Sequence, residues 1–231
     1  MPLIHARGLV KRYRKGSEEI RPVSGLDLDV EEGEFVSIRG PSGSGKSTLL
    51  HLLGGLDRPD EGTLTVAGAS LGTLSEPELC RFRNRNVGFV FQVFHLVPVL
   101  SALENVELPL RLTNLSKARR REQAELALSL VGLSDRLTHR PDELSGGQQQ
   151  RVAIARAIAT DPKLILADEP TGDLDEKTGE EIIDLFCGLH EQHKKTIVMV
   201  THDVEKAPRA TRQLHYSRGT VGPAPARGSA A

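Results

Sequence analysis

The segment Gly40–Ser47 restricts the possible folds more than any other part of the sequence. It reads GPSGSGKS and fits the pattern G-x-x-x-x-G-K-[ST]. A short apolar strand is predicted just before it, at Phe35–Ile38, and a helical pattern with leucines at Leu49–Leu53 follows it. Because the pattern requires a strand, a loop and a helix in this order, we favour a phosphate-binding loop over a chance run of glycines.

The residue types of this loop suit a phosphate group. Its glycines let the backbone curl so that the N–H groups point inward, and the start of the next helix adds positive potential. Lys46 would reach the β- and γ-phosphates of a nucleotide, and the Ser47 hydroxyl would bind Mg²⁺. The predicted nucleotide-binding residues here are Gly40, Pro41, Ser42, Gly43, Ser44, Gly45, Lys46, Ser47 and Thr48.

A second signal is the segment Leu164–Glu169, an apolar strand that ends in two acidic residues. The pair would lie at the carboxyl edge of a parallel sheet, where ligands bind in α/β folds. Asp168 would hold Mg²⁺ through its water shell, and Glu169 could polarise an attacking water, a step that typically contributes roughly 10²–10⁴-fold. Alone, the pair would fit a helix N-cap equally well. Together with the glycine loop it indicates a nucleotide site.

A third signal is the segment Leu144–Gln148, which reads LSGGQ. Ser145 is typical of a helix N-cap, and a helix with one apolar face is predicted over Gln148–Ala159. The amides of Gly146 and Gly147 would form a second anion site, although a capped helix alone also explains the segment. Glycine is about 1 kcal/mol less favourable than alanine inside a helix, which suggests that a ligand approaches this backbone closely. Whether the two anion sites meet within one chain or between two stays open.

Composition excludes several classes of protein. The chain has 231 residues, and 30 Lys+Arg against 31 Asp+Glu give no support for binding nucleic acid or an anionic membrane surface. Aromatic residues make up 3% and tryptophan is absent, so a base-stacking platform is not expected. Cys80 and Cys187 stand apart from any CxxC or Cys/His cluster, so neither a disulfide nor a zinc site is expected. No signal peptide and no apolar stretch approaching 18 residues is recognised, so a membrane role would act through a partner.

The chain changes character along its length, as expected for one α/β domain with an inserted part. The first third is predicted to be β-rich, the segment Glu76–Ala159 mostly helical, and the last third to alternate strand and helix as in a parallel sheet. Beyond the elements named above, we expect strands at Leu3–Tyr13, Leu26–Val30, Gly62–Val66, Val87–Phe91 and Thr196–Val200, helices at Lys117–Val131 and Gly179–His190, and a loose tail from Gly219.

Four segments in this order resemble the ATP-binding subunit of ABC transporters: Gly40–Ser47, Leu144–Gln148, Leu164–Glu169 and Thr201–Asp203. The resemblance extends from about Leu3 to Val221, and LSGGQ between the two nucleotide motifs is highly specific to that family. It implies an α/β fold with a P-loop NTPase (RecA-like) core, an antiparallel β subdomain and an inserted α-helical subdomain. The implied single ABC ATPase domain covers residues 1–221, with the core and β subdomain at 1–90 and 157–221, the helical signature subdomain at 91–156 and a loose tail at 222–231.

Further residues receive roles only through this resemblance, which implies an ATP hydrolase that uses ATP and Mg²⁺. Tyr13 falls where an aromatic ring stacks on adenine, although an ordinary strand aromatic would fit as well. Gln92 falls at a glutamine that senses Mg²⁺ and the attacking water, and His202 at a histidine that contacts the γ-phosphate. Asp175 belongs to a loop at the seam between two subunits. The implied catalytic residues are Glu169, His202 and Gln92, and the implied metal-binding residues are Ser47, Gln92 and Asp168.

The same resemblance implies partners. Two subunits would close head to tail, so that Gly40–Thr48 of one and Ser145–Gln148 of the other enclose each ATP. The second ATPase subunit would be an identical copy or a paralogue, and an integral membrane permease would complete the complex, with no nucleic acid. The chain would then lie peripherally on the cytoplasmic face of the inner or plasma membrane.

A finer resemblance involves Gln92–Pro98, Leu103–Val106 and His139–Pro141, which look like the lipoprotein-release and macrolide-export group (LolD and MacB), with the cell-division ATPase FtsE as a neighbour. The apolar segment Phe94–Leu100 would dock a cytoplasmic helix of a membrane partner, or pack beneath a loop. Two features depart from the group. Asp173 stands where an asparagine is usual, which places a carboxylate near the seam, and the segment Ala210–Val221 follows the family's final strands poorly.

These observations leave several functions in competition. The first is an ATPase subunit that powers lipoprotein release, export or force transmission through a separate membrane subunit. An FtsE-like regulatory ATPase that moves no substrate, or an importer subunit, would carry the same motifs. A soluble ABC ATPase that acts on nucleic acid or ribosomes usually has two cassettes or long coiled-coil insertions, for which this chain is too short.

Overall fold

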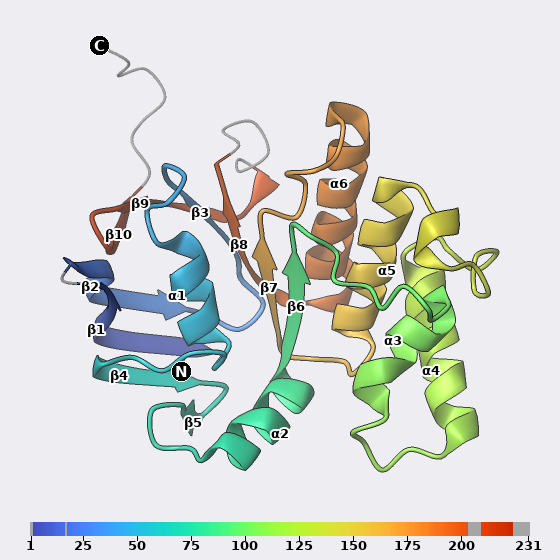
Figure 1. The fold of residues 1–231 in the computed structure, drawn as a ribbon, viewed down its shortest axis with the longest axis horizontal. Coiled ribbons are helices and arrows are strands. Elements are labelled where there is room, and N and C mark those ends of the chain that lie inside the picture. The colour runs from blue at the N-terminus through green and yellow to red at the C-terminus, as the bar shows by residue number, and fades with distance from the viewer. Residues whose placement is uncertain (1, 17, 203–208, 224–231) are drawn as a thin grey trace.

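Two β-sheets and a set of helices make up the fold, which the computed structural model describes for residues 2–16, 18–202 and 209–223 (Figure 1). The strands are β1 (Ile4–Lys15), β2 (Glu18–Val30), β3 (Phe35–Arg39), β4 (Glu61–Val66), β5 (Ala69–Ser70), β6 (Val87–Phe91), β7 (Leu164–Asp168), β8 (Thr196–Thr201), β9 (Arg212–Ser217) and β10 (Thr220–Pro223). The helices are α1 (Lys46–Leu53), α2 (Glu76–Asn86), α3 (Ala102–Leu110), α4 (Lys117–Leu130), α5 (Gly146–Ile158) and α6 (Glu176–His193), with a 3₁₀ helix η1 (Pro141–Glu143). Within the described ranges, no helix has the length and apolar character needed to cross a membrane.

The larger sheet has the strand order β10-β9-β3-β8-β7-β6, and strands β9, β3, β8, β7 and β6 run parallel. β3, β7 and β8 are buried on both faces and mostly apolar, as is typical of the central strands of a covered parallel sheet. The register pairs Arg39 with Thr201, Val200 with Asp168, and Asp168 with Phe91. The segments that follow β3, β8, β7 and β6 therefore begin side by side at one edge of the sheet.

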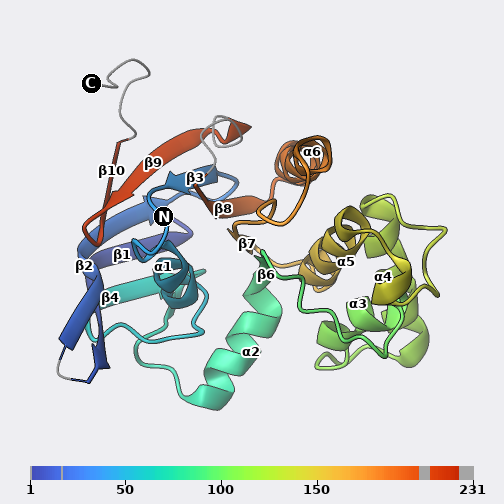
Figure 2. The same cartoon turned by 45° about the horizontal axis from the view of Figure 1, so that its top comes forward.

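The apolar core occupies both faces of this sheet. Leu164 and Leu166 of β7 belong to a cluster shared with α1 and the smaller sheet, whereas Ile165 and Ala167 belong to a cluster shared with α3, α4, α5 and α6. The alternation arises because successive side chains of a strand point to opposite faces. Figures 1 and 2 both show α3, α4 and α5 gathered in one group beside the sheets. The domain boundaries at residues 90/91 and 156/157 stay a prediction.

The smaller sheet is antiparallel, with the strand order β2-β1-β4-β5. Strand β2 begins at Glu18 rather than at Leu26, so the predicted start was wrong. Residues Glu18–Arg21 are exposed and pair with the end of β1 beyond the core, so they show no apolar alternation that a sequence pattern could reveal. This extension of β2 brings Ile20 and Pro22 to the pocket described below.

Two helices also begin earlier than predicted, because their first turns are polar. Helix α5 was predicted to begin at Gln148 and α6 at Gly179, whereas they begin at Gly146 and Glu176. The Ser145 side chain accepts a hydrogen bond from the Gln148 N–H at 3.3 Å, and the Asp175 carboxylate accepts one from the Thr178 N–H at 3.0 Å. These N-cap contacts fix where each helix starts, whereas apolar periodicity only marks where its buried face starts.

The end of the chain is more regular than its sequence suggested. Strands β9 and β10 form an antiparallel hairpin, which corrects the expected loose tail from Gly219 as far as Pro223. Arg218 and Gly219 have φ angles of 50° and 81°, and positive values at both positions are typical of a type I′ hairpin turn. The completely buried Tyr216 of β9 donates its hydroxyl hydrogen bond to the Pro22 carbonyl. Of the predicted tail, residues 224–231 lie outside the described part of the chain.

Candidate functional site

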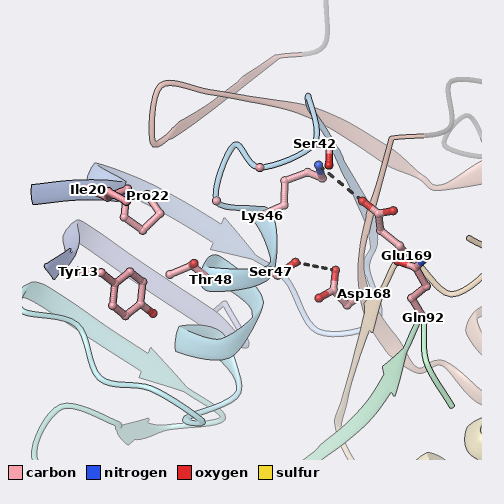
Figure 3. Close-up of a pocket in the computed structure, with 12 residues that line it drawn as sticks. Tyr13, Ile20, Pro22, Ser42, Lys46, Ser47, Thr48, Gln92, Asp168 and Glu169 are labelled. Atoms are coloured by element: carbon pink, nitrogen blue, oxygen red, sulfur yellow. Dashed lines mark hydrogen bonds and ion pairs between the residues drawn. The ribbon is translucent and has the colours of Figure 1, made fainter. Parts of the chain in front are cut away.

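A pocket of about 460 Å³ lies at the edge of the larger sheet where β3, β7 and β6 end (Figure 3). Its volume is within the usual range for small-molecule sites. It is lined by Tyr13, Ile20, Pro22, Ser42, Gly43, Gly45, Lys46, Ser47, Thr48, Gln92, Asp168 and Glu169. Sequence analysis singled out all of these except Ile20 and Pro22. The one signal for Ile20 is an apolar residue within the exposed, charged start of β2.

The loop between β3 and α1 can close only with glycine at particular positions. Gly45 has a φ of 110°, and a Cβ atom there would lie 2.5 Å from the Pro22 carbonyl oxygen. A Cβ atom at Gly40 would lie 2.5 Å from the Tyr216 carbonyl oxygen. Real Cβ contacts are not this short, so both glycines are required by packing against β2 and β9 as well as by the turn itself.

The loop presents a buried cation and an orphaned hydroxyl to a ligand. Lys46 is 4% exposed, and its Nζ donates to the carbonyls of Gly40 and Pro41, each at 2.9 Å. Among the residues that the structure describes, the buried Ser44 Oγ has no hydrogen-bond partner. A buried polar atom without a partner is costly, so the unpaired Ser44 hydroxyl and the Lys46 ammonium fit a loop that donates hydrogen bonds to an anion. The residues present therefore suit phosphate.

A hydroxyl and a carboxylate face each other on the other side of Lys46. Ser47 Oγ donates to Asp168 Oδ1 at 3.1 Å, joining the start of α1 to the end of β7 (Figure 3). Burial raises the pKa of Asp168 above its ordinary value. In the described residues there is no group of three or more His, Cys, Asp or Glu side chains that could hold a metal ion. Mg²⁺ commonly uses one or two carboxylates together with substrate phosphates, so this pair suits a magnesium nucleotide rather than a free ion.

Glu169 is held between two basic side chains. Its Oε1 lies 3.8 Å from Lys46 Nζ, and its Oε2 lies 2.7 Å from Nδ1 of His202 at the end of β8. The Glu169 backbone has a φ of 45°, a strained value for a residue other than glycine, while its N–H donates to the Val200 carbonyl. Strained backbone of this kind clusters at functional sites, so Glu169 is held in place at some cost. The predicted neighbour Asp203 lies outside the described residues.

Tyr13 stands at the opposite end of the pocket, in a network that the sequence did not reveal. Its hydroxyl donates to Asp57 Oδ2 at 2.6 Å, and Lys11 Nζ donates to Asp57 Oδ1 at 2.7 Å and to the Arg58 carbonyl at 2.9 Å. Burial, together with the bond to Asp57, raises the pKa of Tyr13 to about 12. Because Asp57 follows α1, this network ties the tyrosine ring to the helix that the glycine loop opens.

Gln92 reaches the pocket from the end of β6. Its Nε2 donates to Asp173 Oδ1 at 2.7 Å, so the residue that departs from the usual asparagine contacts a predicted catalytic residue. The sequence placed Asp173 only near a subunit seam.

The predicted second anion site lies apart from this pocket. Among the described residues, the pocket lining includes neither Ser145, Gly146, Gly147 and Gln148 of that site nor Asp175 of the predicted seam. Ser145 and Gln148 form a reciprocal capping box at the start of α5. A Cβ atom at Gly147 would lie 2.3 Å from Thr178 Cγ2, so the neighbouring α6 already requires this glycine. At Gly146 the nearest contact would be an ordinary 3.4 Å. Packing therefore explains Gly147, for which the sequence suggested either a ligand or a capped helix alone.

Comparisons with known proteins agree with this geometry. The model of the ABC transporter family matches residues 23–172. An uncharacterized ABC transporter ATP-binding protein of Thermotoga maritima is 52% identical over 211 residues, which cover 91% of this chain and 90% of that protein. This chain belongs to the ABC transporter family. It is an ATP-binding and ATP-hydrolysing subunit of that family, so the predicted family, fold class and enzyme class are confirmed.

Two other relatives of this ABC subunit are informative. The ATP-binding cassette MJ0796 of Methanocaldococcus jannaschii, solved as a dimer in a post-hydrolysis state bound to ADP and Pi, has a TM-score of 0.87. It is 46% identical, and the match covers 94% of this chain and 96% of that one. The macrolide export ATP-binding/permease protein MacB of Rhodopseudomonas palustris is 46% identical over 93% of this chain but only 33% of its own length.

Proposed function

We propose that this ABC subunit binds ATP with Mg²⁺ in the pocket, closes head to tail on a second copy, and drives a separate membrane subunit. The observation that carries the proposal is the meeting of Lys46, Asp168 and Glu169 at one sheet edge. These side chains come from two segments more than a hundred residues apart in the sequence, and the parallel register brings them together. A cation for phosphate, a ligand for a metal and a base for water thus share one pocket.

Phosphate binding would begin at the glycine loop. The Lys46 ammonium donates to two neutral carbonyls, and charged phosphate oxygens are stronger acceptors for such a group. The N–H groups at the start of α1 would add donors and positive potential. Ser47 and Asp168 would hold Mg²⁺ beside the phosphates. Held there, the ion would supply positive charge that offsets the negative charge developing during phosphoryl transfer.

Hydrolysis would depend on Glu169 as the base. Its carboxylate would accept the proton of the attacking water, a role that contributes about 10²–10⁴-fold. His202 is hydrogen-bonded to the carboxylate and would keep it oriented toward the pocket. Glu169→Gln is therefore expected to bind ATP and lose nearly all turnover. A variant that turns over at the wild-type rate would contradict the assignment of the base.

A second copy would complete the site. The start of α5 supplies backbone N–H groups but does not line the pocket of its own chain. The similar cassette MJ0796 is described as dimeric. Head-to-tail closure would bring Ser145–Gln148 of one chain over the nucleotide held by Gly40–Thr48 of the other. Asp175, at the start of α6, would lie at the seam.

A membrane partner would dock on the segment after Gln92. Val93, Val97 and Val99 are 60%, 37% and 74% exposed. The segment is nevertheless held, because Arg156 of α5 donates to the carbonyls of Phe94 and His95 at 2.8 Å and 2.6 Å. An exposed apolar surface on a fixed backbone suits a helix of a partner protein. Because MacB proteins join a similar cassette to a permease in one chain, we propose a partner of the export or lipoprotein-release kind at the cytoplasmic face of the membrane.

Affinity capture from detergent-solubilised native membranes tests this partner. The wild-type chain should retain a membrane protein with few spans and a large extracytoplasmic domain. Val99→Asp should lose that protein while its ATPase rate is unchanged, and Leu126→Asp, which changes another exposed apolar residue, on α4, should retain it. Capture of a many-spanning permease would instead indicate an importer. Capture of no membrane protein by an active ATPase would contradict the proposed partner.

A further inference from the structure

The amide of Gln92 has a partner that can hold it in only one orientation. Gln92 Nε2 donates to the Asp173 carboxylate at 2.7 Å. An ionised carboxylate accepts hydrogen bonds and donates none, whereas an amide has one donor end and one acceptor end. Only the NH₂ end of Gln92 can therefore face Asp173, and the carbonyl oxygen is turned to the other side. Oxygen is the atom that Mg²⁺ and a water proton would use.

The loop that carries Asp173 also leaves space for this amide. A Cβ atom at Gly172 would lie 2.9 Å from both Cδ and Nε2 of Gln92. The Gly172 N–H donates to the Glu169 carbonyl at 3.0 Å, so a hydrogen-bonded turn connects the proposed base to the glycine that contacts Gln92. Gly172 therefore leaves room for the Gln92 amide, and the neighbouring Asp173 accepts a hydrogen bond from that amide.

A buried side chain of α5 fixes the two loops against each other. Gln150 is completely buried, and its Nε2 donates to the Phe91 carbonyl at 3.2 Å and to the Pro170 carbonyl at 2.6 Å. Phe91 directly precedes Gln92, and Pro170 precedes Gly172 by two residues. The short contact between Gln92 and Asp173 thus joins two segments whose backbones are already held at a set separation.

We propose that Asp173 is a positioning residue that orients the Gln92 amide with its oxygen toward the metal and water side of the pocket. This inference rests on the proposed function of the pocket. An asparagine at position 173 could accept from Gln92 Nε2 or donate to Gln92 Oε1, so it would hold the amide without selecting its orientation. The carboxylate selects one orientation, so the aspartate at position 173 has a defined task.

The test measures metal dependence of nucleotide binding in the Glu169→Gln background, which removes turnover from the readout. Binding of a fluorescent ATP analogue is followed while Mg²⁺ is titrated, and the Mg²⁺ concentration at half-saturation is recorded. Asp173→Ala should raise this midpoint about tenfold, as loss of a partner that orients a metal ligand typically does. Asp173→Asn should raise it less. Asp135→Ala, which removes an exposed carboxylate that pairs with its neighbour Arg136, is the matched control and should leave the midpoint unchanged.

A double-variant comparison separates orientation from a general effect of charge. If Asp173 acts through Gln92, then Gln92→Ala should raise the midpoint by itself, and adding Asp173→Ala should raise it little further. Gly172→Ala, which intrudes on the amide and keeps the carboxylate, should raise the midpoint as well. An unchanged midpoint in Asp173→Ala, or a full additional shift in the Gln92→Ala background, would overturn the inference. Absence of any Mg²⁺-dependent binding in the Glu169→Gln chain itself would instead overturn the proposed function, and the inference with it.

Discussion

Nδ1 of His202 lies 2.7 Å from Oε2 of Glu169, although 33 residues separate them in the sequence. The two residues follow β8 and β7, which are neighbours in the parallel sheet. The imidazole is exposed and the carboxylate of the proposed base is mostly covered.

Loss of this contact should slow hydrolysis more than it weakens binding. His202→Ala leaves the carboxylate of Glu169 free to turn toward Lys46, so we expect turnover to fall roughly 10²-fold. ATP affinity should change little, because the glycine loop and Lys46 are untouched. Steady-state turnover and equilibrium binding of a fluorescent ATP analogue measure the two effects. His193→Ala, on the exposed end of α6, is the control. An equal loss of affinity and turnover would show that the histidine acts in nucleotide binding instead.

The two tyrosines should ionise at unusually high pH. Burial and Asp57 raise the pKa of Tyr13 to about 12, and burial raises the pKa of Tyr216. Because the chain has two tyrosines and no tryptophan, ultraviolet absorbance should show no tyrosinate forming near pH 10 while the protein is folded. Asp57→Asn should lower the Tyr13 pKa, since a neutral amide no longer disfavours the tyrosinate. Ionisation of one tyrosine near pH 10 in the folded chain would contradict the network.

The raised pKa of Tyr13 also predicts how the stability of the fold changes at alkaline pH. A tyrosine is neutral when protonated, and here its folded pKa lies above the unfolded value of about 10. The unfolded chain therefore releases the proton first as pH rises. The stabilising contribution of Tyr13 is complete below pH 10 and is lost as pH increases toward 12. Denaturant unfolding at several pH values should show this loss for the wild-type chain and a smaller one for Tyr13→Phe.

Variants of Gly147 can distinguish a role of this glycine in packing against α6 from a role in ligand binding. Gly147→Ala would press its Cβ against Thr178 Cγ2, and overpacking of this kind typically costs about 1–3 kcal/mol. Thr178→Ser removes that methyl group and keeps the N–H that Asp175 caps, so the double variant should recover stability. Thermal unfolding without nucleotide measures both. If Gly147→Ala leaves the stability of the nucleotide-free chain unchanged, the glycine is required only for a ligand or a partner.

Much of the site was predictable because its residues lie in short segments with a fixed backbone context. The glycine loop, Asp168 and Glu169 are each recognisable from a strand and the residues that follow it. Lys11, Asp57 and Gln150 were missed because each makes its hydrogen bonds with a group that is distant in sequence. A single sequence carries no signal for such pairs.

The fold shows the same division. Helix α4 was predicted over Lys117–Val131 and is observed over Lys117–Leu130, because an apolar face and a stop glycine mark both ends. The polar starts of β2, α5 and α6 were missed, since hydrogen bonds rather than burial define them. The hairpin of β9 and β10 was missed because Arg218 adopts a positive φ that its residue type disfavours.

The most direct test of this account is the ATP-dependent oligomeric state of the Glu169→Gln chain, measured by light scattering after size exclusion. With ATP and Mg²⁺ this variant should form a dimer, because ATP is bound and not hydrolysed. Glu169→Gln combined with Ser145→Arg should bind ATP equally well and remain a monomer, since the change lies outside the pocket of its own chain. A dimer that persists unchanged in the Ser145→Arg chain would contradict a site completed by the second copy.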